Sequence, residues 1–144
     1  MSAPAPGVLH AYDYALVRVV PRTETGDGEA VGVALHARRA RVFALVLADT
    51  PDALGARLAA RYPGLDARLT ACALRGMTEV AEGRGGPLGL LPPSERFHWL
   101  VAVRSSVLQA SPVRTGVSAD PTVEAERIAA AIRGAWDPRA PTGV

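Results

Sequence analysis

The sequence of 144 residues has no lysine, no asparagine and only one cysteine, Cys72. All 16 positively charged side chains are therefore arginine. Because this pattern runs through the whole chain, it is typical of GC-rich bacterial codon usage and does not by itself indicate phosphate recognition. A single cysteine excludes an intramolecular disulfide, and it cannot form the cysteine pair of a zinc motif.

Long apolar runs and a strong net charge are also missing. No segment reaches the roughly 18 consecutive apolar residues of a membrane helix, and the N-terminus has no signal-peptide pattern. We therefore expect a cytoplasmic protein without membrane contact. The net charge of +2 is spread along the chain, so nucleic acid is not an expected partner.

The sequence contains none of the common metal and cofactor motifs. Its three histidines lie too far apart for a local zinc signature. It also lacks the phosphate-binding loop, the serine-hydrolase elbow and the HExxH motif. We expect no metal and no cofactor, and the residues identify no catalytic nucleophile.

Hydrophobic periodicity and turn residues predict a single α+β domain. The predicted order is βββααββα, an antiparallel sheet of about five strands with helices on one face. Strands are expected over 12–20, 29–36, 41–48, 96–104 and 106–110, and helices over 51–62, 65–81 and 121–136. The domain is expected to cover residues 12–136, with flexible tails at 1–11 and 137–144.

Local signals support the predicted helices and the segment that follows the second of them. Thr50 and Asp120 are N-cap residues, each followed by a proline at the first helical position. In the helix expected over 65–81, a stripe that includes Leu69 and Met77 is predicted to be buried, with Cys72 as a small core residue. The glycine- and proline-rich segment 83–93 is predicted to be a loop, and long loops are often functional.

Arg18 is the first candidate binding residue. It shares a register of the first strand with Tyr14 and Leu16, and the opposite register holds Ala15 and Val17. If the first set is buried, the guanidinium group needs an anionic partner; if the second is buried, Arg18 points into water. The periodicity leaves both alternatives open.

A second group of candidates follows the predicted loop. In the strand expected over 96–104, Trp99 lies on one side, and His98 and Arg104 lie toward the other. Trp99 and Arg96 form a ligand clamp if the ring stacks on a ligand and the guanidinium supplies charge. Alternatively, Trp99 fills the core and Arg96 pairs with Glu95 or faces solvent.

The segment 111–116, SPVRTG, is the third candidate. Two hydroxyl groups, a guanidinium group and backbone amides within six residues are compatible with an anion-binding nest that uses Ser111 and Arg114. More often, such a segment is a turn whose hydroxyl groups bond to its own backbone. If the arginines form one site, Arg18, Arg96 and Arg114 should converge within a single pocket.

Four segments, YALVRVVPR, EAVGVALHAR, LPPSERFHWLVAVRSSVLQASPVRTG and DPTVEAERIAAAI, resemble the bacterial domain-of-unknown-function family 3037. The resemblance covers about residues 12–133. It implies a small bacterial protein without an assigned activity, and a partnered or regulatory role beside a HipA-like kinase encoded by a neighbouring gene.

Carried over position by position, the family resemblance singles out one set of residues: Tyr14, Arg18, Pro21, Gly32, Arg96, Phe97, Trp99, Arg104, Ser105, Pro112 and Gly116. The chain departs from the family pattern at Ala30, Val103 and Arg114, where asparagine, proline and histidine are usual. If that histidine acts as a general base in the family, this chain lacks the base, because an arginine keeps its proton.

Three functions are compatible with these residues. The first is a non-enzymatic interaction or regulatory protein, which binds a phosphate- or carboxylate-bearing ligand or a kinase through clustered arginines. The second is a small enzyme that acts on an anionic substrate with His98 and Glu95 as acid–base groups. The third is an oligomeric structural domain that pairs a sheet face or edge with a copy of itself.

Overall fold

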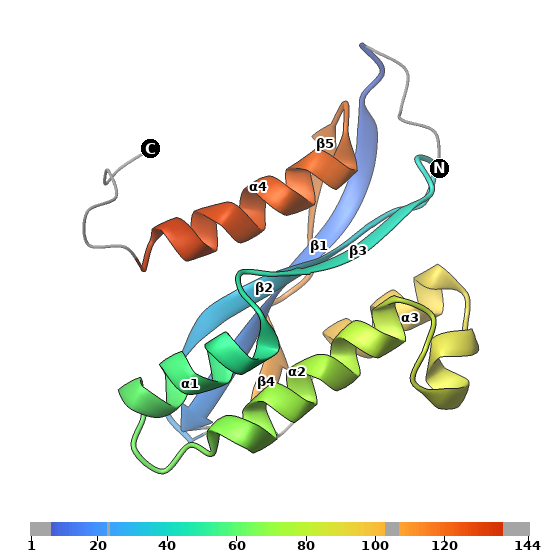
Figure 1. Cartoon of the computed structure of the whole chain (residues 1–144). Helices are drawn as coiled ribbons and strands as arrows, with labels where there is room; N and C mark the ends of the chain where they lie inside the picture. The colour runs from blue at the N-terminus through green and yellow to red at the C-terminus, as the bar shows by residue number, and fades with distance from the viewer. Residues whose placement is uncertain (1–6, 23, 103–106, 137–144) are drawn as a thin grey trace.

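The computed structural model describes residues 7–22, 24–102 and 107–136, and in these ranges it contains five strands and four α-helices (Figure 1). The elements are β1 (His10–Arg22), β2 (Asp27–Ala37), β3 (Val42–Leu47), α1 (Pro51–Arg61), α2 (Ala67–Ala81), the 3-10 turn η1 (Gly86–Leu90), α3 (Pro93–Val101), β4 (Leu108–Ala110), β5 (Arg114–Ser118) and α4 (Pro121–Gly134).

The strands form one antiparallel sheet in the order β3-β2-β1-β4, and β5 also pairs with β1. Two short strands therefore share the outer edge of β1, with Val17 opposite Ala110 in β4 and Tyr14 opposite Arg114 in β5. The α+β class and the five-stranded antiparallel sheet predicted from the sequence are confirmed.

The helices cover both faces of the sheet. Phe43 and Leu45 of β3 pack on the core that α1, α2 and α3 cover, whereas the alternate residues Ala44 and Val46 pack on the core of α4. Figure 1 shows α4 on one side of the sheet and α2 and α3 on the other. The prediction of helices on one face is wrong, because the β3 sequence VFALVL is apolar at every position and needs cover on both faces.

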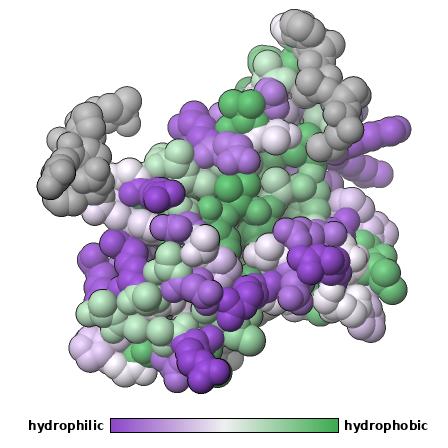
Figure 2. Space-filling model, in the orientation of Figure 1, coloured by the Kyte–Doolittle hydropathy of each residue, from purple (hydrophilic) through white to green (hydrophobic). Residues whose placement is uncertain are grey.

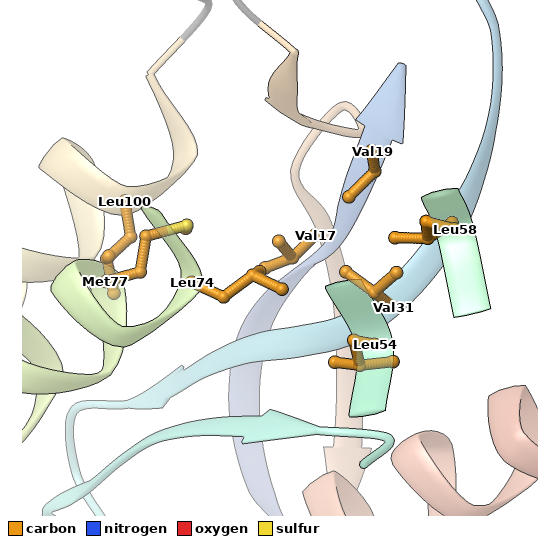
Figure 3. Close-up of a cluster of buried hydrophobic side chains, with 8 residues drawn as sticks. All are labelled: Val17, Val19, Val31, Leu54, Leu58, Leu74, Met77 and Leu100. Carbon is orange, nitrogen blue, oxygen red and sulfur yellow. The ribbon is translucent and has the colours of Figure 1, made fainter. Parts of the chain in front are cut away.

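The main core lies between β1, β2 and the first three helices (Figure 3). Its buried members are Val17, Val19, Val31, Leu54, Leu58, Leu74, Met77 and Leu100. Valines from β1 and β2 and leucines from α1, α2 and α3 thus meet in one cluster. Burial of such side chains stabilises the fold by about 1.5–3 kcal/mol each.

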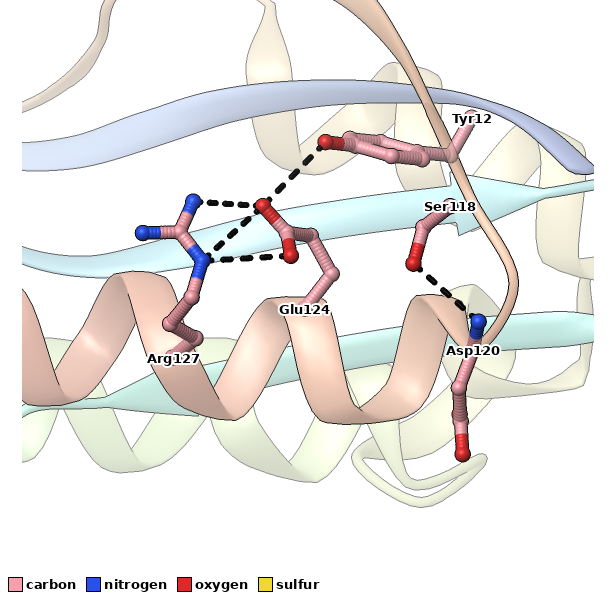
Figure 4. Close-up of polar contacts among 5 residues, drawn as sticks. All are labelled: Tyr12, Ser118, Asp120, Glu124 and Arg127. Carbon is pink, nitrogen blue, oxygen red and sulfur yellow. Dashed lines mark hydrogen bonds and ion pairs between the residues drawn. The ribbon is translucent and has the colours of Figure 1, made fainter. Parts of the chain in front are cut away.

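A second core joins α4 to β1, β2 and β3. Tyr12 is buried there, and its hydroxyl group donates to Glu124 Oε1 at 3.5 Å (Figure 4). Arg127 donates to the same carboxylate, and this hydrogen bond lowers the pKa of Glu124 below its usual value. Burial raises the pKa of Tyr12. These contacts fix α4 against β1.

Between residues 83 and 118 the structure differs from the sequence prediction. The strand expected over 96–104 is the helix α3, the loop expected over 83–93 contains η1, and the turn expected over 111–116 runs into β5. Pro93 occupies the first turn of α3, a position that proline favours in helices. Phe97 and Leu100 are the buried residues of α3, and their three-residue spacing belongs to a helix.

The buried face of α2 is shifted by about one residue from the predicted stripe. Leu74, Met77 and Val80 are buried, but Leu69 is 70% exposed and Cys72 is exposed. The prediction that Leu69 and Cys72 belong to the core is therefore wrong. None of the helices in the described ranges has the length and apolar character that a bilayer-spanning segment requires.

Candidate functional site

A cleft of about 1220 Å³ opens beside the hairpin turn between β1 and β2. Its walls come from that turn, the connection between α1 and α2, the exposed side of α2, the end of α3 and the start of β4. The apolar side chains that line it include Tyr62, Leu65, Leu69, Met77, Trp99 and Leu108. Three regions of the chain, within residues 21–28, 61–85 and 99–108, therefore build one cleft.

The connection between α1 and α2 brings the first of these side chains to the cleft. Tyr62 ends α1 in an extended conformation, as expected for a residue that precedes proline. Pro63 and Gly64 then turn the chain, and Gly64 has a φ of 93°, which glycine adopts without strain. Asp66 accepts hydrogen bonds from the backbone amides of Arg68 and Leu69 and so starts α2.

Glu29 fastens this wall of the cleft to β2. Its carboxylate lies 3.4 Å from Arg57 Nε and 3.1 Å from Arg61 Nε, and the Tyr62 hydroxyl group donates to it at 3.3 Å. The Glu29 side chain is only 14% exposed, and its Oε2 receives the contacts of Arg61 and Tyr62, whereas its Oε1 has only the ion pair with Arg57 and no hydrogen bond. The last turn of α1 is thereby held against the hairpin.

Charged residues of both signs surround the apolar side chains. Arg22 and Arg61 lie on the lining together with Asp27, Asp66 and Glu79. Within the described ranges, no three histidine, cysteine, aspartate or glutamate side chains gather as a metal site. The cleft thus combines an apolar floor with a rim of mixed charge.

Arg96 lies at the junction of α2 and α3. Its Nη1 donates to the carbonyl oxygens of Val80 at 3.3 Å and Ala81 at 2.6 Å, and its Nε donates to Leu91 at 2.9 Å. Its Cζ also lies 5.0 Å from the centre of the Phe43 ring. Arg96 therefore joins α2, α3 and the sheet, and its guanidinium group is occupied by the protein's own backbone.

Arg18 and Arg114 lie away from Arg96. Ala15, Val17 and Val19 form the buried register of β1, so Arg18 points to the opposite face, where its Nη2 donates to Gly28 O at 3.3 Å. Arg114 is exposed on β5. Neither of the two described cavities is lined by Arg18, Arg96 or Arg114, so the expectation of one shared arginine pocket is not met. Anion binding at each residue separately stays a prediction.

The remaining candidates are divided between the cleft and other surfaces. Trp99 lines the cleft and packs against the main core, as its core alternative predicts, and stacking of its ring on a ligand stays a prediction. Glu95 and His98 are exposed on α3 and do not line the cleft. Arg104 lies outside the described residues.

Ser111 completes the hydrogen-bonding edge between β4 and β5. Its hydroxyl oxygen accepts from the Leu16 amide at 2.8 Å, while its own amide donates to the Leu16 carbonyl at 2.9 Å. The hydroxyl group replaces a strand carbonyl where the backbone leaves the ladder at Pro112. These two bonds join the segment to β1, and within the segment the Ser111 hydroxyl group donates to the Pro112 carbonyl at 3.3 Å.

We expect Ser111→Ala to lower the free energy of unfolding by about 1–2 kcal/mol, because the Leu16 amide loses its acceptor. Urea denaturation measures the change. The control is Ser94→Ala, which removes the hydroxyl group of an exposed serine and should change stability by less than about 0.5 kcal/mol. Equal midpoints for the two variants would contradict this role of Ser111.

A smaller cavity of about 460 Å³ lies between the β2–β3 turn and the start of α3. His36, Phe43 and Pro93 line it. The His36 ring centre lies 5.8 Å from that of Phe97, and burial lowers the pKa of His36. An apolar environment of this kind favours the neutral imidazole over its charged form.

Comparison with known proteins places the chain in a family. The family model described as "Protein of unknown function (DUF3037)" matches residues 14–132. The chain belongs to the DUF3037 family. Searches of curated proteins and of solved structures gave no match.

Several DUF3037 positions that the resemblance singled out have a structural role in this chain. Phe97 is buried, Arg96 bridges two helices, and a Cβ atom at Gly116 would lie 2.5 Å from the Tyr12 ring. A Cβ atom at Gly32 would lie 2.7 Å from the carbonyl oxygen of Val46. Among the family positions described by the structure, Trp99 and Pro21 line the cleft.

The sequence did not predict the cleft. Leu69 was assigned to the core, although it is exposed. Tyr62 and Leu65 also line the cleft and were not candidates. A different choice of the buried face of α2 would have revealed the exposure of Leu69. A helical stripe of apolar residues centred on Leu74 also fits this segment, and it leaves Leu69 on the outer face.

Proposed function

We propose that this protein is a non-enzymatic interaction module that binds an apolar segment of a partner protein in the cleft. The observation that carries the proposal is the open apolar cleft with Leu69 exposed on its rim. The proposal keeps the interaction role inferred from the sequence and moves its surface from the arginines to the cleft.

The dimensions of the cleft favour a polypeptide over a small ligand. Small-molecule pockets usually have volumes of about 300–1000 Å³ and enclose most of the ligand. The cleft, at about 1220 Å³, exceeds that range. A helix or an extended segment of a partner, with several apolar side chains, can occupy such a volume.

The residue types in the cleft support the same interpretation. Tyr62, Trp99 and Met77 belong to the types enriched at the centres of protein interfaces. An exposed leucine continuous with such a floor is costly in water and gains stability when a partner covers it. The charged rim can orient the partner, because rim charges affect the rate and specificity of association.

A HipA-like kinase is the first partner to test, because the family resemblance implies one. The alternative of an enzyme with Glu95 and His98 gains no support from the cleft, which these residues do not line. Arg114 remains a candidate for a separate contact with an anionic group of the partner.

Site-specific cross-linking in the native host tests the proposal. A photoreactive amino acid replaces Leu69 in the cleft or, as a matched control, Leu90 on η1, which is 83% exposed and outside the cleft. We expect one protein to be cross-linked through position 69 and not through position 90. Cross-linking of no protein, or of the same proteins from both positions, would contradict the proposal.

Direct binding to the purified kinase gives a quantitative test. Leu69→Asp should weaken binding by at least about tenfold, because a charge in the apolar interface loses its hydration. Leu90→Asp should bind as the unchanged protein does. If Leu69→Asp keeps full affinity for the cross-linked partner, the cleft is not the binding surface.

A further inference from the structure

The strand β3 forms an edge of the sheet, and it is apolar along its whole length. It stands first in the strand order and pairs only with β2 among the described strands. From Phe43 to Leu47 every residue is partly exposed. Figure 2 shows a hydrophobic area over the middle of this face, where Figure 1 places β3 between α4 and α2.

The backbone of β3 presents unpaired groups to this edge. The Ala48 amide donates to the Val31 carbonyl at 2.8 Å, which makes these two residues a hydrogen-bonded pair. Such pairs alternate along an antiparallel ladder, so the even-numbered residues of β3 bond to β2. The amide and carbonyl groups of Phe43, Leu45 and Leu47 therefore point away from β2.

Three devices that often protect an edge strand are absent from β3. The sequence VFALVL contains no proline and no charged residue, and its pairing with β2 shows no bulge. A strand of this type readily pairs with another strand, because the pairing satisfies its exposed backbone groups and covers its apolar side chains.

We propose that β3 pairs antiparallel with β3 of a second copy of this chain. In the register centred on Leu45, Leu45 lies opposite its own copy and Phe43 lies opposite Leu47. All three outward-facing residues then join hydrogen-bonded pairs. The two five-stranded sheets become one continuous sheet.

The charges at the two ends of β3 favour a second copy over an unrelated strand. Arg41 immediately precedes the strand and is exposed, and Asp49 lies two residues beyond its end. The same two-fold register brings Arg41 of each copy toward Asp49 of the other, because 41 and 49 are equally distant from 45. The Asp49 side chain is 34% exposed; its Oδ1 accepts from the Thr50 amide at 2.7 Å, and its Oδ2 pairs with Arg133 at 3.8 Å, near the limit of an ion pair.

This dimer is independent of the proposed partner binding. No residue of β3 lines the cleft. The contact between the two β3 strands therefore does not cover the cleft residues of either copy. Binding of the kinase and formation of the dimer can therefore be measured separately.

Sedimentation velocity over a range of protein concentrations tests the assembly. We expect a monomer–dimer equilibrium that Arg41→Glu weakens by about tenfold, since two like-charged pairs form per dimer. The double variant Arg41→Glu with Asp49→Arg should restore the dimer. Arg68→Glu makes the same charge change at an exposed position of α2 and should leave the dimer unchanged.

Amide hydrogen exchange of the unmodified protein tests the surface without any variant. The amides of Phe43, Leu45 and Leu47 should exchange more slowly as the concentration rises through the dimer range. A protein that stays monomeric up to about 1 mM, or a dimer in which these three amides keep their monomer rates, would overturn the proposal.

Discussion

Replacing Arg96 by alanine is expected to lower the free energy of unfolding by about 2–4 kcal/mol, more than any other single arginine in the described chain. Three backbone carbonyl groups, those of Val80, Ala81 and Leu91, lose a charged donor together, and that of Val80 keeps a backbone donor, the Gly83 amide. Hydrogen bonds to a charged group are worth about 1.5–3 kcal/mol each, and partial access of water offsets some of the loss.

The position of Arg96 at a helix end increases the effect. Val80 and Ala81 are the last residues of α2, where carbonyl groups lack the usual intrahelical donor, and the Val80 carbonyl accepts from the Gly83 amide at 3.1 Å as well as from Arg96. The last turn of α2 has no basic residue of its own, so Arg96 supplies the positive charge that stabilises the negative end of the helix dipole. The contact with the Phe43 ring adds a cation–π interaction.

Urea denaturation of Arg96→Ala, Arg96→Lys and Arg84→Ala measures this role. Lysine keeps the positive charge, but its single ammonium group cannot replace the separate Nε and Nη1 donors of the planar guanidinium group. We therefore expect Arg96→Lys to recover only part of the lost free energy of unfolding. Arg84 pairs with Glu82 on the surface, and its removal should leave the denaturation midpoint nearly unchanged. If Arg96→Ala instead keeps full stability and abolishes binding of an anion, Arg96 is a ligand residue and its structural role is wrong.

The sequence was sufficient to predict the elements that local signals define. The β1–β2–β3 meander follows from alternation and turn residues, and α1 and α4 begin where Thr50 and Asp120 cap them. These features depend on residues close together in the chain. The antiparallel sheet follows because short turns connect successive strands.

The helix α3 could not be separated from a strand by its sequence alone. Phe97, Trp99 and Val101 alternate as in a strand, while Phe97 and Leu100 also have helical spacing. A short apolar segment is compatible with both periods, and tertiary contacts decide between them. Here Phe97 packs beside His36 of β2, and Arg96 fastens the first turn of α3 to the end of α2.

The candidate site was harder to predict, because it depends on how distant segments meet. The cleft joins the β1–β2 turn, α2 and β4, and no local pattern specifies that contact. The arginines were grouped into a site that the structure does not form. The sequence suggested one site for Arg18, Arg96 and Arg114, but Arg18 and Arg96 donate to backbone carbonyl groups. Backbone acceptors at helix and strand ends cannot be recognised from charge composition.

Replacing Gly55 by alanine is expected to lower the free energy of unfolding by about 2–3 kcal/mol, although alanine is the better helix former. Gly55 lies in the buried face of α1, where α1 crosses the start of α2. A Cβ atom at this position would lie 2.4 Å from the Ala67 carbonyl oxygen. Because that oxygen belongs to the backbone, the two helices must separate to admit a methyl group.

Gly76 provides the matched control for this prediction. It also lies inside a helix, α2, but a Cβ atom there would have no neighbour within 4 Å. Gly76→Ala should therefore raise the free energy of unfolding by about 0.5–1 kcal/mol, since alanine reduces the conformational freedom of the unfolded chain. The two substitutions add the same methyl group with opposite expected signs.

Urea denaturation of both variants separates packing from helix propensity. If propensity alone decided stability, both glycine variants would be stabilised by a similar amount. If the crossing of α1 and α2 is as close as the Gly55 to Ala67 contact requires, only Gly76→Ala is stabilised. Stabilisation by Gly55→Ala would mean that α1 and α2 lie farther apart than described. The wall of the cleft, which the connection between these helices forms, would then have to be placed differently.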